Sequence, residues 1–142
     1  MIRTYERSGV RFQYPGNWSI ETEDAGAGWT ATVTSPDTAL LVFTLRPEAD
    51  SPAALADEAL SALKAEYKEL DAEPAVESIA GRPAVGHDVD FLTLDTAVVC
   101  RLRGLETPAG PLLVLAQTSE YDRARLDPVL RAVVASIHLS DA

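Results

Sequence analysis

The most constraining feature of this sequence is a pair of long runs in which apolar and polar residues alternate. The first run extends from Ala84 to Leu94 and the second from Thr96 to Glu106. Alternation with a period of two places the apolar side chains on one face of a strand and the polar side chains on the other. Two such runs joined by a short turn predict an antiparallel hairpin within a larger sheet.

The turn between the two runs decides which residues of the hairpin face each other. A turn at Asp95-Thr96 sets Asp88 opposite Arg103 and Asp90 opposite Arg101, which matches opposite charges on one face. The other face then carries Val89, Phe91, Cys100 and Leu102. Asp-Thr is a poor two-residue turn, however, and a longer loop would shift this register.

Shorter alternating or apolar runs predict further strands over residues 10–14, 18–20, 29–34, 40–45, 76–79 and 112–117. Turn-forming segments separate them, among them Pro15-Gly16-Asn17, Gly26-Ala27-Gly28 and Ser35-Pro36-Asp37. The runs from Leu40 and from Leu112 are apolar on both faces. We therefore expect the strand that begins at Leu40 to lie inside the sheet, with cover on both sides.

Two helices are predicted. Ser51 can cap a helix that begins at Pro52 and extends to about residue 70. Its apolar stripe comprises Leu55, Ala59, Leu63 and Leu70, with Ala56, Leu60 and Tyr67 beside them. Asp127-Pro128 predicts the start of a C-terminal helix over about 127–137, with residues 121–126 as a turn or kinked extension. The fold class is therefore α+β, an antiparallel sheet with both helices packed on it.

Length and charge narrow the classes of function. The 142 residues, 46% of them hydrophobic, are expected to form a single domain over 1–142, with no linker. The net charge of −10, from 12 basic and 22 acidic residues, disfavours nucleic acid and anionic membranes. No apolar run near the start has the length of a signal peptide, so a cytoplasmic location is expected unless a signal was removed.

The residues that most often carry catalysis or bind metals are few. Cys100 is the single cysteine and has apolar neighbours, so we expect a buried, inert thiol. His87 is expected on the apolar face with Val85 and Val89, and His138 follows the last helix. Neither histidine has a second ligand at metal-binding spacing, so no metal site and no cofactor are predicted.

No catalytic motif is present either. Asp88 and Asp90 share a face about 7 Å apart, a separation that could suit paired acid-base work. The arginines expected opposite them favour a charge ladder on a solvated face instead. There is no phosphate-binding loop, dinucleotide fingerprint or nucleophile elbow. A serine nucleophile assembled in space stays open, but we predict that the protein is not an enzyme.

The order of these elements can be compared with a known family. The segment Val10-Arg11-Phe12-Gln13-Tyr14-Pro15-Gly16-Asn17-Trp18 resembles the opening strand, proline turn and tryptophan of Mog1/PsbP/DcrB-like domains. The strand that ends near Arg46-Pro47, the long helix, the Gly81-Arg82-Pro83-Ala84 turn and the closing Ser136-Ile137-His138-Leu139 continue the resemblance over nearly the full length.

The resemblance implies a Mog1/PsbP-like sandwich that serves as a binding or scaffold surface rather than as a catalyst. The group includes Eag chaperones, which must offer an apolar sheet face to a membrane helix of their client. The face expected here carries Asp88, Asp90, Arg101 and Arg103 instead, and this disfavours such clients. The family's functions diverge, and fold alone does not choose among them.

Three hypotheses for function follow. The leading one is a non-enzymatic protein-binding, scaffold or chaperone-like module whose partner is another protein and which contacts neither nucleic acid nor membrane. The alternative is a small-molecule carrier or unrecognised enzyme with a pocket between sheet and helix, lined by Trp18, Trp29 or Tyr67. The third is a homodimer formed through the sheet.

Overall fold

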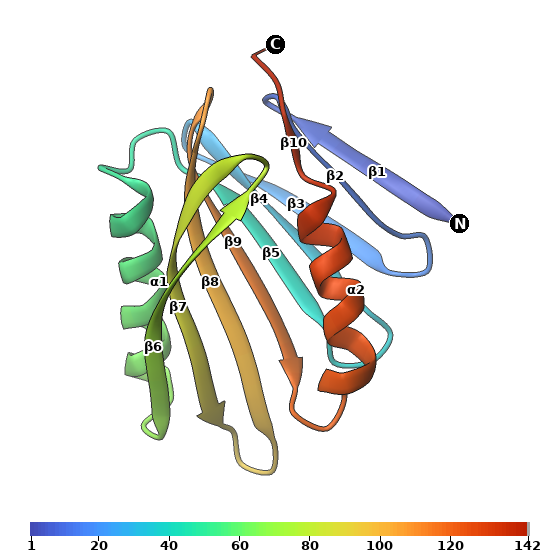
Figure 1. Cartoon of the computed structure of the whole chain (residues 1–142), viewed down its shortest axis with the longest axis vertical. Coiled ribbons are helices and arrows are strands. Elements are labelled where there is room, and N and C mark those ends of the chain that lie inside the picture. Colours follow the sequence, from blue (N-terminus) through green and yellow to red (C-terminus); the bar gives the residue numbers. More distant parts are fainter. Residues whose placement is uncertain (142) are drawn as a thin grey trace.

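The computed structural model describes residues 1–141. The larger of two antiparallel sheets has seven strands, and the smaller has three (Figure 1). In their order across the larger sheet, the strands are β3 (Ser19–Ala25), β4 (Gly28–Thr34), β5 (Leu40–Leu45), β9 (Gly110–Ser119), β8 (Ala97–Thr107), β7 (Arg82–Leu92) and β6 (Leu70–Ile79). The smaller sheet comprises β1 (Ile2–Arg7), β2 (Val10–Pro15) and β10 (His138–Leu139).

Two strands that are consecutive in the sequence, β2 and β3, lie in different sheets. The turn after Pro15 leads from β2 in the small sheet to β3 at one edge of the large sheet. The Gly26 turn, in contrast, joins β3 and β4 as a hairpin, with Ala25 paired to Gly28. As expected, β5 lies inside the sheet, between β4 and β9.

Helix α1 (Pro52–Glu66) begins where the sequence predicts. The Ala54 amide donates to the Ser51 hydroxyl at 3.0 Å, and Pro52 occupies the first turn. The predicted end near residue 70 is wrong, because Tyr67 already has extended backbone angles and Leu70 pairs with Phe91 as the first residue of β6. Leu70, the last residue of the predicted apolar stripe, therefore belongs to the sheet rather than to the helix.

Helix α2 (Arg123–Ala135) corrects the prediction at both ends. Its regular turns begin four residues before Asp127, so Pro128 lies inside the helix rather than at its start. Burial of Leu126 and the bond from the Leu126 amide to the Asp122 carbonyl hold the first turn in place. Tertiary packing thus outweighs the tendency of proline to mark the start of a helix. Because Pro128 has no N–H group, the helix lacks one backbone hydrogen bond there.

The helices lie on opposite faces of the large sheet. Alternate residues of β9 show this, because Val114 packs in the cluster that contains Leu130 of α2, whereas Leu113 packs with Leu55 of α1. We call these the α2 face and the α1 face. The small sheet also covers the α2 face, where Phe12 stacks on Phe43 with ring centroids 3.9 Å apart.

The hairpin of β7 and β8 has a longer turn than predicted. Thr93 and Thr96 close a four-residue loop through a backbone bond of 2.9 Å. The register therefore shifts by two residues, and Asp88 lies opposite Arg101 while Asp90 lies opposite Val99. A shift of two keeps every side chain on its predicted face, so the apolar face with Val89, Phe91, Cys100 and Leu102 is confirmed.

Candidate functional site

The α2 face of the large sheet is covered unevenly. Helix α2 packs on β9 and β2, whereas β6, β7 and β8 form no comparable packing with it (Figure 1). A groove follows β7 and β8 between α2 and the edge strand β6, and three cavities of about 170, 150 and 630 Å³ succeed one another along it. We call it the ionic groove. The charged residues along it are Asp71, Glu73 and Glu77 on β6, Asp88 and Asp90 on β7, Arg101 and Arg103 on β8, and Arg123, Asp127 and Arg131 on α2. Lys68, Glu69 and Glu120 also line the cavity of about 630 Å³.

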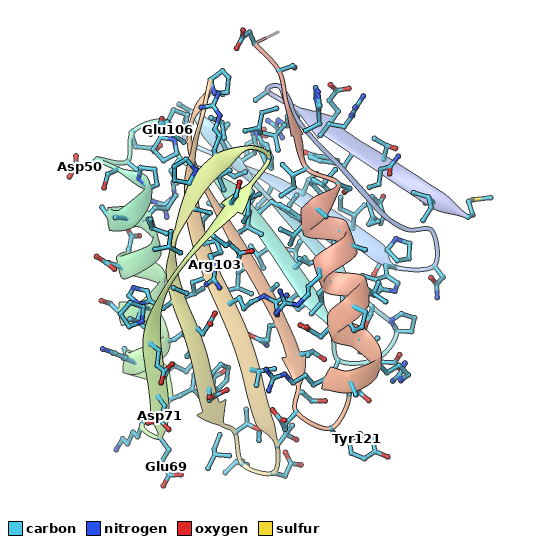
Figure 2. The ribbon with its side chains drawn as sticks, in the orientation of Figure 1. Asp50, Glu69, Asp71, Arg103, Glu106 and Tyr121 are labelled. Atoms are coloured by element: carbon cyan, nitrogen blue, oxygen red, sulfur yellow. The ribbon has the colours of Figure 1, made fainter. Side chains whose placement is uncertain are left out.

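Arg103 is the buried centre of the groove, near the middle of the strands in Figure 2. Its side chain is 7% exposed, and it joins two strands: Nε donates to Glu77 at 2.6 Å and Nη2 donates to Asp88 at 2.7 Å. Nη1 donates to the carbonyl oxygens of His87 and Leu102. All three guanidinium nitrogens are thereby satisfied, as burial of a charge requires.

Gly86 allows this arrangement. It lies opposite Arg103 in the hairpin, and a Cβ atom built there would come within 1.8 Å of the Leu102 carbonyl oxygen. Only glycine permits so close an approach of the two backbones.

Arg101 turns the other way, toward α2. It donates to Asp127, which also accepts from Arg131 at 2.8 Å one turn later in the helix. Burial raises the pKa of the Asp127 carboxyl, but the hydrogen bonds from Arg101 and then Arg131 outweigh it and leave the pKa below its usual value. Asp127 was expected at the start of the helix. It lies inside α2 instead, and its ion pair with Arg101 connects the helix to the sheet.

The remaining carboxylates of the groove have no such partner. Asp71 lies directly opposite Asp90, and Glu73 lies directly opposite Asp88, on the same face of β6 and β7. Like charges directly opposite each other in a sheet are destabilising. Within residues 1–141, Asp71, Glu73 and Asp90 form no ion pair. This end of the groove therefore carries a local excess of negative charge.

The sequence correctly predicted which residues share the charged face of the hairpin. It was wrong about the exposure of that face and about the residue opposite Asp90. Asp88, Asp90, Arg101 and Arg103 do share one face. The face is not an open, solvated ladder, because Arg103 is buried and the Arg101 side chain is only 18% exposed. Asp90 also lacks the arginine that was expected opposite it, since Val99 occupies that position.

The histidines lie apart from the groove, and Cys100 borders its cavity of about 150 Å³ but packs its side chain on the α1 face. His87 is on the α1 face, as expected, where its Nε2 atom lies 2.8 Å from Asp57 of α1. Cys100 is buried on the same face, and that burial raises the pKa of its thiol to about 12. The thiol is therefore protonated at neutral pH, as its apolar neighbours predict. His138 is exposed in β10.

The pocket suggested by the aromatic residues does not form as expected. Trp18 and Trp29 are 7% and 1% exposed within the apolar core. Tyr67 stacks on Phe91 with centroids 4.2 Å apart, and it borders only an open depression beside the turn of β7 and β8. These aromatic side chains serve packing.

Within residues 1–141, no three His, Cys, Asp or Glu side chains are placed to hold a metal ion. None of the helices in that part of the chain combines the length and the apolar character needed to cross a bilayer.

Sequence reasoning missed the walls of the groove. Asp71, Glu73 and Glu77 recur on one face of β6, and this period of two was a usable signal. Asp127 and Arg131 stand four residues apart, which is the spacing of a helical ion pair. The contact of Asp127 with Arg101 of β8 depends on where α2 packs, and no local sequence pattern predicts that position.

Comparison with known proteins identifies the fold. No family model and no curated protein matches the chain. Among solved structures, LpqN of Mycobacterium tuberculosis, described as involved in cell envelope biogenesis, matches with a TM-score of 0.65 and 14% identity, over 99% of this chain and 91% of that one. Cyanobacterial PsbP (CyanoP) of Synechocystis matches with a TM-score of 0.64 and 13% identity, over 98% and 92%.

A third solved structure, PA94 of Pseudomonas aeruginosa, is described as a protein of unknown function. It matches with a TM-score of 0.54 and 17% identity, over 95% of this chain and 94% of that one. Identities this low establish the fold and leave function open. The chain thus has the Mog1/PsbP-like α+β fold that its opening residues suggested.

Proposed function

We propose that this protein is a non-enzymatic module that binds another protein through the ionic groove. The observation that carries the proposal is the unpaired acidic end of the groove, where Asp71 faces Asp90. Charge arrangements that cost stability persist where they serve recognition, since a partner's cations remove the cost on binding. The partner segment is therefore basic.

The shape of the groove supports a segment of a protein rather than a small metabolite. The three cavities are partly open and arranged in line, whereas small-molecule sites are usually single enclosed pockets. The edge strand β6 and helix α2 would flank an extended chain on its two sides. No residue of the groove is a nucleophile beside a base, so nothing in it favours catalysis.

A comparative pull-down from native extract tests this function. The baits are the wild type, the groove variant Asp71→Lys/Asp90→Lys, and the control variant Glu21→Lys/Glu23→Lys on the opposite edge strand. The two variants change net charge equally. We expect at least one protein to be retained by the wild type and the control and lost by the groove variant. Equal retention by all three baits would refute the groove as the binding site.

A second candidate function, carriage of a small apolar molecule, has one observation in its favour. A concavity of about 350 Å³ lies between β2 and α2, and none of its lining residues is charged; they include Tyr14, Pro128, Val129 and Val133. This volume is within the range of ligand pockets. Titration with a fluorescent fatty acid tests it, and saturable binding that Val129→Arg abolishes would favour the carrier.

A further inference from the structure

Arg101 is a mostly buried cation that uses little of its hydrogen-bonding capacity. Its side chain is 18% exposed, yet within residues 1–141 it donates a single hydrogen bond, from Nη1 to Asp127. Arg103, two residues further along β8, has all three of its guanidinium nitrogens bonded. Donors of a mostly buried group are costly to leave without an acceptor. An acceptor that reaches Arg101 therefore gains hydrogen bonds that the fold leaves unmade.

The unbonded nitrogens of Arg101 open onto the groove. No fully buried side-chain nitrogen or oxygen among residues 1–141 lacks a partner, and Arg101 lines the cavities of about 170 and 150 Å³. Arg131 of α2 lines the same two cavities, and its one hydrogen bond in that part of the chain runs from Nε to Asp127. We call the cavity of about 170 Å³ the arginine cavity, because Arg101, Arg103 and Arg131 line it.

The charges that line the two cavities differ. Three aspartates line the cavity of about 150 Å³: Asp88, Asp90 and Asp127. The arginine cavity is lined by one carboxylate, Glu77, which Arg103 already bonds. Within residues 1–141, Arg101 and Arg131 share Asp127 as their one ion-pair partner, so these two cations keep one positive charge in excess. An anion is therefore repelled from the cavity of about 150 Å³ and attracted to the arginine cavity.

The size and the apolar walls of the arginine cavity indicate which anion fits. Its apolar lining comprises Ile79, Val114, Ala116, Val134 and Ala135. These side chains suit methylene groups, and planar guanidiniums suit the two oxygens of a carboxylate. Pockets that enclose a whole small molecule measure about 300–1,000 Å³. The arginine cavity is smaller, so it fits one acidic side chain with a short aliphatic stem.

We propose that the arginine cavity receives a glutamate side chain from the partner protein. The inference rests on the proposed function, and it adds an acidic residue to the basic segment that the unpaired aspartates of the groove select. The glutamate carboxylate accepts hydrogen bonds from the unbonded nitrogens of Arg101 and Arg131, while its methylene groups pack on Val114 and Val134. Once bound, it neutralises the positive charge that Asp127 leaves in excess.

The direct test compares acetyl-glutamate amide with its uncharged isostere, acetyl-glutamine amide. Backbone amide chemical shifts of the labelled protein are followed during titration with each probe. We expect saturable shifts around Arg101, Ala116 and Ala135 with the glutamate probe, and about tenfold weaker binding of the glutamine probe. Equal affinities for the two probes, or no response to either, would overturn the proposal. Tighter binding of inorganic phosphate at the same residues would overturn the choice of a carboxylate.

Two variants locate the bound probe. Arg131→Gln removes the more exposed of the two arginines, so the protein should fold and bind the glutamate probe about fivefold more weakly. Arg11→Gln, at an exposed position of the small sheet, is the matched control and should bind as the wild type does. Ala135→Phe should fill the cavity from an exposed position of α2 and abolish binding. A folded Ala135→Phe protein with unchanged affinity contradicts the proposal.

Failure of this inference is distinguishable from failure of the proposed function. If the pull-down retains a groove-dependent partner while the glutamate probe does not bind, the function stands and the glutamate site is refuted. If the probe binds in the arginine cavity while the pull-down retains no groove-dependent partner, the proposed function fails, and the preference of the cavity for a carboxylate stands.

Discussion

The two halves of the seven-stranded sheet differ in what lies over their α2 face. Over β4 and β5 the small sheet and α2 bury Trp29 and Phe43 almost completely. Over β7 and β6 the same face carries carboxylates, and the buried charged residue among them is Arg103 of the neighbouring strand β8. Continuous antiparallel pairing runs through both halves. The covering layer, rather than the strand pairing, therefore decides whether a sheet face becomes an apolar core or a charged groove.

The largest effect is expected in the covered half. Phe43→Ala removes a ring that is fully buried and stacked on Phe12, so the free energy of unfolding should fall by about 3–5 kcal/mol. Urea denaturation measures it. Leu94→Ala, at a fully exposed turn position, is the control and should change stability by less than about 0.5 kcal/mol. Similar decreases in the free energy of unfolding for the two variants would contradict a larger contribution from the buried half.

Arg103→Ala tests how much the buried cation stabilises the open half. Removing it leaves Glu77 and Asp88 without their cation, but both are partly exposed, so we expect a loss of about 2 kcal/mol rather than the larger cost of a fully buried pair. Arg123→Ala is the matched control, since its pair with Glu120 is 3.6 Å long and half exposed. Urea denaturation should separate the two variants clearly. Equal losses in the free energy of unfolding would show that Arg103 contributes no more to stability than an exposed arginine.

The attachment of α2 to the groove should depend on pH. The folded-state pKa of Asp127 is lowered, so its contribution to stability is present above the unfolded value of about 3.9 and is lost as pH falls through the folded pKa. At neutral pH, Asp127→Asn should cost about 1 kcal/mol. That difference from the wild type should disappear as the pH falls below the folded-state pKa of Asp127. Unfolding measured at several pH values checks this, with Glu21→Gln as a control. A difference that stays constant with pH would exclude an ionic role for Asp127.

The smallest effect concerns the turn of the hairpin formed by β6 and β7. Ala80 and Gly81 both have positive φ angles, and Ala80 is one of two non-glycine residues within 1–141 that do. Ala80→Asn should raise stability by about 0.5 kcal/mol, because asparagine adopts this conformation more readily. Gly81→Ala should act in the opposite direction, since open space around it leaves only backbone strain. Thermal unfolding measures both, and shifts of the same sign would contradict the turn assignment.

Local signals predicted the elements whose stabilising contacts are local. Ser51 caps α1 through an amide three residues away, and the hairpin of β3 and β4 turns at the Gly26 segment that the sequence marks. The start of α2 was mispredicted because Leu126 is buried against residues far away in the chain. The strand β1, which carries only weak alternation, was missed because its pairing with β2 stabilises it.

The sequence by itself determined which side chains share a face, since alternation along a strand survives any shift of register by two residues. Asp88, Asp90, Arg101 and Arg103 were therefore placed together correctly even though their pairing was not. Only the tertiary structure decided that Arg103 forms an ion pair with Glu77 and Arg101 forms one with Asp127, and that Asp90 pairs with neither arginine. The physical reason is that an ion pair between separate elements depends on where β6 and α2 pack, and packing is a property of the whole chain.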